Sequence, residues 1–169
     1  GVNATLRFGA DYNISESQTL TSSFLYSPSR DNNVVDIQYR DFNQGNELLQ
    51  TVNRNDDETE TETTLEGTLS WVKQFKDKDH KWTADLRYTS ERDREQSTIT
   101  EDTLGRLGTF RQDVNNLEDQ SSILIQTDYI RPFGENKSFE TGTRLTLRTI
   151  NNNYALSNIT ENGNLNPVD

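Results

Sequence analysis

Two neighbouring segments of the chain, residues 64–75 and 81–90, alternate apolar and polar side chains with a period of two. This period is the side-chain repeat of a β-strand, and the five residues KDKDH between the segments suit a turn, so the pair predicts an antiparallel hairpin. The polar positions include Glu66 and Asp85, whose charges are costly to bury without partners. The hairpin therefore needs one apolar face and one face that meets water or ionic partners.

The same alternation recurs along the chain and predicts further strands. The predicted ranges are 2–13, 18–27, 64–75, 81–90, 121–133 and 138–150. Short turns, with the sequences ISES, KDKDH and GENK, follow the first, third and fifth strands. Long polar segments follow the other strands, at residues 28–62, 91–120 and 151–169. Because alternation continues in the first long segment and more weakly in the second, we expect strands to extend there and to pair in solvent.

The regular succession of short and long connections is the strongest constraint on the architecture. Antiparallel neighbours joined in this way place every short turn at one end of the sheet and every long connection at the other. Outer-membrane barrels have this asymmetry, and strands of about eleven residues can cross the hydrocarbon layer when tilted. We therefore predict an all-β fold: an antiparallel up-and-down transmembrane β-barrel wall with about six membrane strands and extended external hairpin loops. Since the smallest usual barrels have about eight strands, we expect the chain to be one segment of a larger barrel.

Composition agrees with strands that have a single apolar face. Only 30% of the residues are hydrophobic and the formal net charge is -11, which approaches the composition of chains that cannot bury a core. No apolar run approaches the roughly 18 residues of a transmembrane helix. The absence of cysteine excludes disulfides and thiolate metal sites. The chain has no methionine and no signal-peptide pattern, so we interpret it as a mature protein or a piece of a larger one.

Aromatic side chains lie close to the short turns, where an aromatic girdle at a membrane interface is expected. The predicted girdle consists of Tyr12, Phe75, Trp82, Phe133 and Phe139. The remaining apolar positions of the same face are predicted to contact lipid. They include Leu6, Phe8, Leu69, Trp71, Leu86, Ile123, Ile125, Leu145 and Leu147.

The opposite face of the predicted strands is rich in charge. It includes Arg7, Asp11, Glu66, Asp85, Arg87, Asp128, Glu140, Arg144 and Arg148. These groups would be costly in a dry core unless each were paired, whereas a water-filled or plug-filled lumen accommodates them. The alternative is the exposed face of a soluble sheet.

No catalytic, cofactor-binding or metal-binding residues are predicted. His80 is the single histidine and lies in a charged turn, so we interpret it as a solvated turn residue. The acidic run at residues 56–62 lacks the glycine turn and ligand spacing of a calcium loop, and a solvated external loop is favoured. A negative chain without a basic stripe also argues against nucleic-acid binding.

The sequence QTDYIRPFGENKSFETGTRLTLRT resembles the periplasmic hairpin repeated in the barrels of TonB-dependent, SusC-like receptors and the related outer-membrane β-barrel family. The residues that carry this resemblance are Tyr129, Pro132, Phe133, Gly134, Phe139, Glu140 and Gly142. A second hairpin, GADYNISESQTLTSSFLYS, is similar at Tyr12, Ile14 and Leu20. The receptors' plug, the segment that contacts TonB and the terminal strand ending in Phe have no counterpart in this sequence.

The resemblance implies a barrel in the outer membrane of a Gram-negative bacterium that binds and takes up a nutrient without covalent catalysis. The implied partners are the lipid bilayer, the remainder of the barrel, a TonB-type energy-coupling protein and a surface lipoprotein that meets the outer loops. Two alternatives remain open. One is a barrel that serves as a structural or assembly subunit without transport, and the other is a soluble, secreted β-sandwich used for adhesion or sugar binding.

Overall fold

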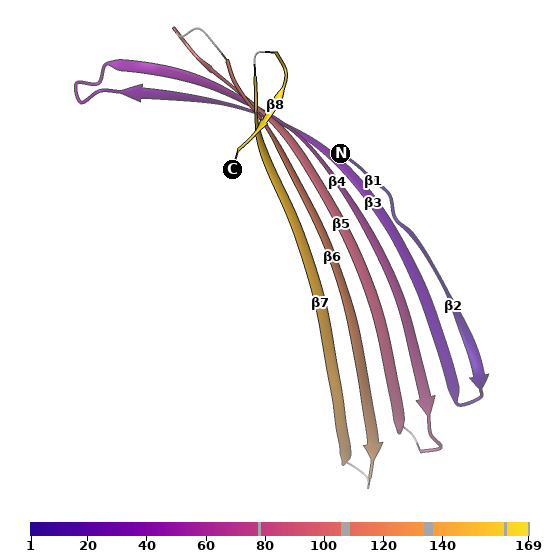
Figure 1. Cartoon of the computed structure of the whole chain (residues 1–169). Coiled ribbons are helices and arrows are strands. Elements are labelled where there is room, and N and C mark those ends of the chain that lie inside the picture. The colour runs from indigo at the N-terminus through magenta and orange to yellow at the C-terminus, as the bar shows by residue number, and fades with distance from the viewer. Residues whose placement is uncertain (78, 106–108, 134–136, 161, 169) are drawn as a thin grey trace.

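A computed structural model of the chain describes residues 1–77, 79–105, 109–133, 137–160 and 162–168. These residues form one antiparallel sheet of eight strands, and Figure 1 shows them side by side as a curved layer. The strands are β1 (Val2–Asn3), β2 (Leu6–Ser15), β3 (Gln18–Phe42), β4 (Leu48–Gln74), β5 (Lys81–Thr103), β6 (Thr109–Pro132), β7 (Ser138–Ile159) and β8 (Leu165–Pro167). Within the described ranges, no helix is long and apolar enough to cross a membrane.

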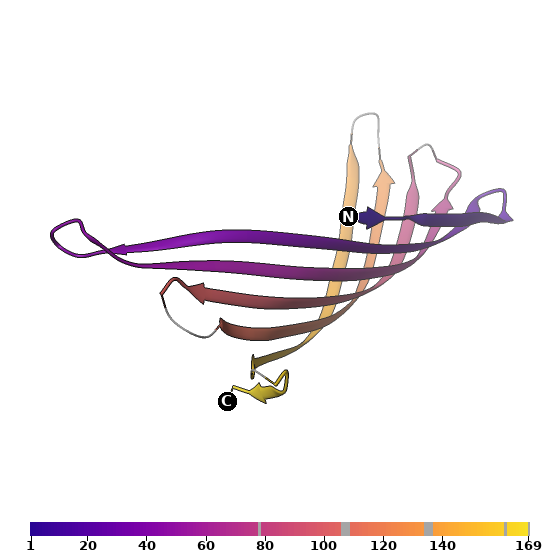
Figure 2. The same cartoon turned by 90° about the horizontal axis from the view of Figure 1, so that it is seen from above.

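The sheet has an up-and-down topology in which each long strand pairs with its neighbour in the sequence. The order is β1, β3, β4, β5, β6, β7, β8, and β2 also pairs with β3. The strand ends that adjoin the short turns all lie at one end of the sheet, and the long strands project at the other end (Figures 1 and 2). Seen from above, the sheet bends into an arc (Figure 2). The all-β, up-and-down prediction is confirmed.

The long strands extend far beyond the ends predicted from the sequence. The pairing of β3 with β4 runs from Gln18 opposite Lys73 to Asp41 opposite Gln50, so most of the segment at residues 28–62 is regular strand. The segments 91–120 and 151–169 likewise contain the distal parts of β5, β6 and β7, together with β8. Threonine and valine occur in both β3 and β4, and β3 also contains isoleucine and tyrosine. These residues favour a pleated sheet even where every second position is charged, as in residues 56–62.

We call residues 6–15, 18–27, 65–74, 81–90, 121–132 and 138–149 the proximal half of the sheet, because they adjoin the short turns. The distal half comprises residues 28–42, 48–64, 91–103, 109–120 and 150–159. In the connection between β3 and β4, Asn43 Oδ1 accepts hydrogen bonds from the backbone N–H groups of Gly45 and Glu47, both at 2.9 Å. Asn46 adopts a left-handed φ of 66°, which asparagine tolerates better than most residues.

The predicted strand at residues 2–13 is divided into β1 and β2, and this corrects the prediction. Residues Ala4 and Thr5 lie outside the ladder, opposite Pro28 of β3. Proline has no backbone N–H to donate, so the pairing is interrupted there. The chain nevertheless stays against β3, because the Ala4 N–H donates to the Pro28 carbonyl oxygen at 3.1 Å and the Thr5 and Ser27 hydroxyl groups lie 3.0 Å apart.

The sheet is a single layer without a hydrophobic core. Among the described residues no hydrophobic side chain is buried, and no second sheet packs against either face. The alternative of a soluble sandwich, which requires two packed sheets, is therefore wrong. The described strands also do not close on themselves: β1 and β2 form one edge, and β7 and β8 form the other.

Gly142 shows why glycine belongs in the hairpin motif of the resemblance. It lies opposite Asp128 of β6, and a Cβ atom at position 142 would collide with the Asp128 carboxylate and approach the Thr127 carbonyl oxygen to 3.1 Å. The Asp128 carboxylate accepts a hydrogen bond of 2.8 Å from Gln126 and so lies over the glycine. Gly134, which belongs to the same motif, lies outside the described residues.

Candidate functional surfaces

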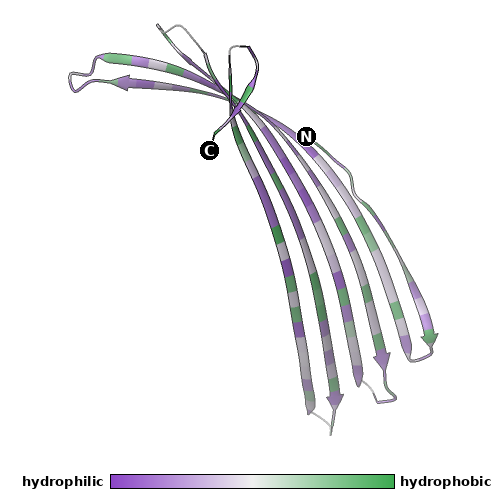
Figure 3. Cartoon of the chain, viewed as in Figure 1, coloured by the Kyte–Doolittle hydropathy of each residue, from purple (hydrophilic) through white to green (hydrophobic). Residues whose placement is uncertain are grey.

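The register joins the apolar positions of all long strands into one continuous face, which we call the apolar face. One row consists of Ala10, Ser22, Leu69, Leu86, Ile125 and Leu145, each opposite the next on the neighbouring strand. The next row outward consists of Phe8, Phe24, Gly67, Tyr88, Ile123 and Leu147. Leu6 lies one row further out, and Trp71 lies one row nearer the short turns. The residues predicted to contact lipid therefore share one face. Figure 3 shows hydrophobic positions interspersed with polar ones along the strands of the proximal half.

The side chains of the apolar face are exposed. Leu6, Phe8 and Leu147 are 56% to 60% exposed, and Leu69 and Leu86 are 42% and 44% exposed. Soluble monomers rarely expose a contiguous apolar patch larger than a few hundred Å². A surface of this kind requires an apolar environment or a covering partner.

Charge is absent from the apolar face over the whole proximal half, except beside the short turns. From the row of Trp71 to the row of Leu6 every position on this face is apolar, small or an uncharged hydroxyl. Lys73 and Arg131 are the charged residues of this face, and both lie at the ends of their strands near the turns. The pattern matches the uncharged outward band of a membrane barrel.

The predicted girdle residues lie at the short-turn end. Tyr12, Phe133 and Phe139 are 68%, 53% and 53% exposed, and they lie in β2, just after β6 and near the start of β7. Trp82 makes an edge-to-face contact with Trp71, with ring centroids 5.4 Å apart, and its Nε1–H donates to Thr127 Oγ1 at 2.7 Å. These rings lie beside the short turns, the position that an interfacial girdle would occupy.

His80 is not a solvated turn residue, and this corrects the prediction. Its imidazole stacks on the Phe75 ring with centroids 4.0 Å apart, and its Nε2 lies 3.0 Å from the Tyr129 hydroxyl group. Only 13% of its side chain is exposed. The preceding residue, Asp79, has a left-handed φ of 63°, and the backbone turns there so that Phe75 N–H donates to the His80 carbonyl oxygen. The cluster therefore fixes the turn, and Tyr129, which was not among the predicted girdle residues, contacts both Phe75 and His80.

A second pair of aromatic residues marks the outer limit of the apolar face. Tyr26 and Tyr88 are 40% and 48% exposed and lie at the distal ends of the apolar runs in β3 and β5. The sequence already contained this signal, because both tyrosines share the parity of the apolar residues in their strands. They were not predicted as girdle residues because they lie far from the short turns.

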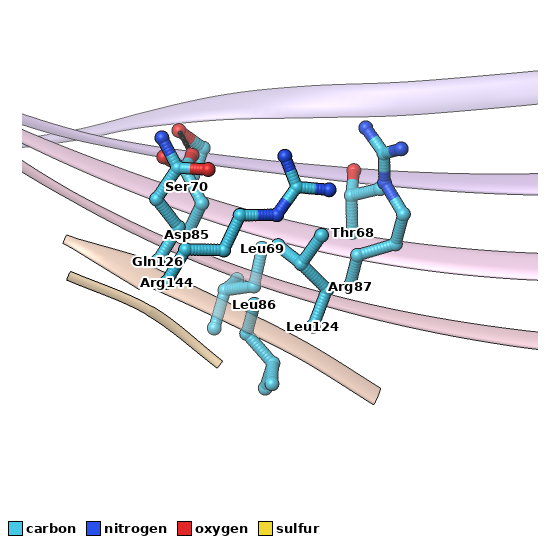
Figure 4. A pocket seen from close by; sticks show the side chains of 9 residues that line it. All are labelled: Thr68, Leu69, Ser70, Asp85, Leu86, Arg87, Leu124, Gln126 and Arg144. Carbon is cyan, nitrogen blue, oxygen red and sulfur yellow. Dashed lines mark hydrogen bonds between the residues drawn. The ribbon is translucent and has the colours of Figure 1, made fainter. Parts of the chain in front are cut away.

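The opposite face, which we call the inner face, is polar and partly ion-paired in the proximal half. Figure 4 shows a depression on this face lined by threonine, serine, aspartate, glutamine and arginine side chains from β4 to β7. Ser70 Oγ donates to Asp85 at 2.5 Å, and Arg87 forms an ion pair of 3.8 Å with Glu66. The Arg144 side chain reaches into the same depression. Polar and charged groups of this kind carry no desolvation cost if this side of the sheet faces open, hydrated space.

The inner face of the distal half is strongly acidic. Its carboxylates include Asp31, Asp56, Glu58, Glu60, Glu62, Glu91, Asp93, Glu95 and Glu118, which the register places on four neighbouring strands. The register places Glu62 opposite Asp93, and Asp93 opposite Glu118. The charge of Asp93 and that of other nearby carboxylates raise the pKa of Glu60. Desolvation, followed by the charges of Glu62 and Glu118, raises the pKa of Asp93.

Strand alternation explains why these charges gather on one face. In the run at residues 56–62 the glutamates occupy even positions on the inner face, whereas Thr59 and Thr61 face the other way. In β5 the sequence ERDRE places Glu91, Asp93 and Glu95 inward and Arg92 and Arg94 outward. Among the residues that the structure describes, no three acidic or histidine groups converge as a metal site would require.

Comparison with known proteins was consistent with this geometry. A model of the outer membrane protein beta-barrel family matches residues 73–169, which is more than half of the chain. No curated protein matches the chain. The matched residues include β5, β6, β7 and β8, and β4 continues the same ladder in unbroken register with β5. The uncharged apolar face, the polar inner face and the matched family agree, and the chain belongs to the outer membrane protein β-barrel family.

Proposed function

We propose that this chain forms part of the barrel wall of a TonB-dependent-type receptor in the outer membrane of a Gram-negative bacterium, where it binds a nutrient and allows it to pass. In this proposal the apolar face contacts lipid, and further strands pair with the two open edges to complete the barrel. Open sheet edges are not tolerated in the hydrocarbon layer, which supports the need for these additional strands.

The observation that carries the proposal is the difference between the two ends of the sheet. At the short-turn end the strands stop within a few residues of the girdle, whereas β3 continues for sixteen residues beyond Tyr26. At roughly 3.3 Å per residue this extension is about 50 Å long. Its inner face continues the inner face of the proximal half, so a solute that contacts the distal hairpins meets the same surface that lines the lumen.

Binding followed by gated passage suits the chemistry of the inner face. The proximal half offers hydroxyl groups, amides and paired charges such as Arg87 with Glu66, and these groups can exchange hydrogen bonds with a hydrated solute. Covalent catalysis is not part of the proposal. The external hairpins are also the surface that a surface lipoprotein would meet, and the periplasmic end is the side from which a TonB-type protein would supply energy.

Shortening the longest hairpin tests the proposal. Asp36 pairs with Asn55, so replacing residues 36–55 by Asn–Gly joins Val35 to Asp56 in a two-residue turn that keeps the register. We expect the shortened protein to assemble in the membrane but to lose uptake. Growth of the producing bacterium would be measured on a panel of oligosaccharides, peptides and iron chelates as single nutrient sources, with and without a protonophore.

A matched control shortens the β5–β6 hairpin instead. Glu101 pairs with Phe110, so an Asn–Gly turn between Thr100 and Arg111 removes a smaller tip in the same way. A receptor is supported if the shortened protein loses growth on one nutrient and the control loses less. Growth of the unaltered bacterium on that nutrient should also be sensitive to the protonophore. If deletion of the whole protein leaves growth on every nutrient unchanged but alters the composition of the outer membrane, the chain serves as a structural or assembly subunit instead.

A further inference from the structure

We call the uncharged part of the apolar face, from the row of Trp71 to the row of Leu6, the apolar band. Arginine side chains lie on the same face, immediately beyond the outer end of this band. Arg30 follows Tyr26 by four residues in β3, and Arg92 follows Tyr88 by four residues in β5. Arg94 is two residues further along β5. The apolar band ends at the same spacing from the first arginine on both strands, although these strands are two apart in the sheet.

The spacing places these arginines at the depth of lipid headgroups. The four residues from Tyr26 to Arg30 span about 13 Å along the strand, and the six residues from Tyr88 to Arg94 span about 20 Å. A strand tilted by about 45° rises about 9 Å and about 14 Å over these lengths. The hydrocarbon core is about 30 Å thick and the whole bilayer is about 40–45 Å thick, so each headgroup layer is about 5–8 Å deep. Because an arginine side chain can extend toward the membrane along its own apolar stem, its guanidinium reaches this layer.

Two of these arginines flank a single position in one row. Arg30 lies opposite Thr61, and Thr61 lies opposite Arg94, so the two guanidinium groups come from strands about 10 Å apart on either side of a small side chain. Both arginines are exposed, and neither has an ion-pair partner among the residues that the structure describes. Arg92, by contrast, is bound to Asp119 at 2.6 Å.

We propose that Arg30 and Arg94, with Thr61 between them, bind the phosphate groups of anionic lipids in the outer leaflet. Two guanidinium groups can hold a phosphate through paired, charge-assisted hydrogen bonds. The chain has a formal net charge of -11, so an exposed cationic pair at this depth is not a consequence of its overall composition. The proposal rests on the lipid contact of the apolar face that is proposed above.

The absence of cysteine in the chain allows a local measurement. Thr61→Cys would be labelled with an environment-sensitive fluorophore, and the protein would be reconstituted in phosphatidylcholine vesicles. Quenching of the fluorophore would be compared for phosphatidic acid and phosphatidylcholine that each carry a nitroxide quencher on one acyl chain, close to the headgroup. We expect phosphatidic acid to quench at several-fold lower membrane fraction, and we expect this preference to weaken as salt concentration rises.

The decisive variant combines Arg30→Gln with Arg94→Gln. A basic residue at a membrane surface contributes roughly a fivefold preference for anionic lipid, so the double variant is expected to lose most of the preference. The matched control combines Arg40→Gln with Arg111→Gln, which removes the same charge from the same face further from the membrane. The control should retain the preference. The proposal would be overturned if the double variant kept the preference for phosphatidic acid, or if the control lost that preference to the same extent.

A separate readout distinguishes failure of this proposal from failure of lipid contact itself. Trp71 and Trp82 lie on the apolar face, so lipids brominated on their acyl chains should quench tryptophan fluorescence if that face contacts lipid. Quenching without headgroup preference overturns only the arginine site. Absence of both signals overturns the lipid contact of the apolar face and the arginine site together.

Discussion

The proximal and distal halves of the sheet share the same strands, the same register and the same period of two, yet they distribute charge in opposite ways. In the proximal half the apolar face excludes charge and the inner face tolerates both signs. In the distal half both faces carry charge: most of the carboxylates lie on the inner face, and among the described residues every arginine of this half except Arg54 lies on the outer face. The ladder of backbone hydrogen bonds therefore determines the shape, and the environment of each half determines which side chains its two faces can carry.

The largest expected effect comes from placing a charge on the apolar face. Leu69→Arg or Leu86→Arg should cost roughly 2–4 kcal/mol if these positions lie near the middle of the bilayer, and this should block assembly. The membrane-inserted fraction, measured by protection from protease, reports the result. Thr68→Arg and Thr83→Arg make a similar change on the inner face and should be tolerated. Equal behaviour of the two pairs would contradict the assignment of the lipid-contacting face.

A smaller effect is expected from removal of the tryptophan ring that anchors the short-turn end. Trp82→Ala loses the edge-to-face contact with Trp71 and the hydrogen bond to Thr127, and should cost roughly 2 kcal/mol. Urea unfolding of the reconstituted protein measures this change. Phe110→Ala removes an aromatic ring of the distal half that is 46% exposed, and it should change stability little. A larger loss at Phe110 than at Trp82 would reverse the comparison.

The acidic inner face predicts a pH dependence that is confined to the distal half. The pKa of Glu60 is raised above its ordinary value of 4.5, so the folded state binds protons more readily than the unfolded state. Stability from this group is therefore lost as pH rises through the window that begins near 4.5 and ends at the raised pKa, and it is regained on acidification. Hydrogen exchange of distal amides should slow on acidification by more than the intrinsic exchange rate requires.

Glu60→Gln tests the cause of that dependence. The variant removes one charge from the acidic group, so distal amides should exchange more slowly at neutral pH and respond less to acidification. Proximal amides serve as the internal reference, because no comparable cluster of carboxylates lies beside them in the described residues. A dependence of equal size in both halves would contradict a local electrostatic origin.

The smallest effect is expected when the change made at Leu86 is repeated on the same face of the same strand in the distal half. Thr98 of β5 shares the parity of Leu86 but lies opposite Asp57 and Asp113. Thr98 is half-buried, but Thr98→Arg should change stability by less than about 0.5 kcal/mol, because surface substitutions away from a packed core are usually close to neutral. Loss of assembly in this variant would mean that the apolar environment reaches further than the apolar band.

The sequence alone predicted the architecture because strand alternation and turn length are local properties. The parity of Leu69 and Leu86 is readable from the order of residues, and so is the closeness of Trp82 to a short turn. Strand length was harder to predict, since the Glu and Thr alternation after Pro28 has the period of a strand but the polarity of a loop. The packing of His80 between Phe75 and Tyr129 was unpredictable, because it joins residues from two hairpins.

Neighbouring strands from β4 through β7 pair without a break in register, and this pairing bears on the order in which the sheet folds. A slip of one residue in any pair of strands would move every apolar side chain of the moving strand to the inner face. Closing a short connection costs less entropy than closing a longer span of chain, so each hairpin is expected to nucleate at its own turn, including residues 43–47 between β3 and β4, and to lengthen from there. The contact of Phe75 with His80 forms at that first step, which makes it the point at which correct and incorrect alignments are separated before most of the ladder exists.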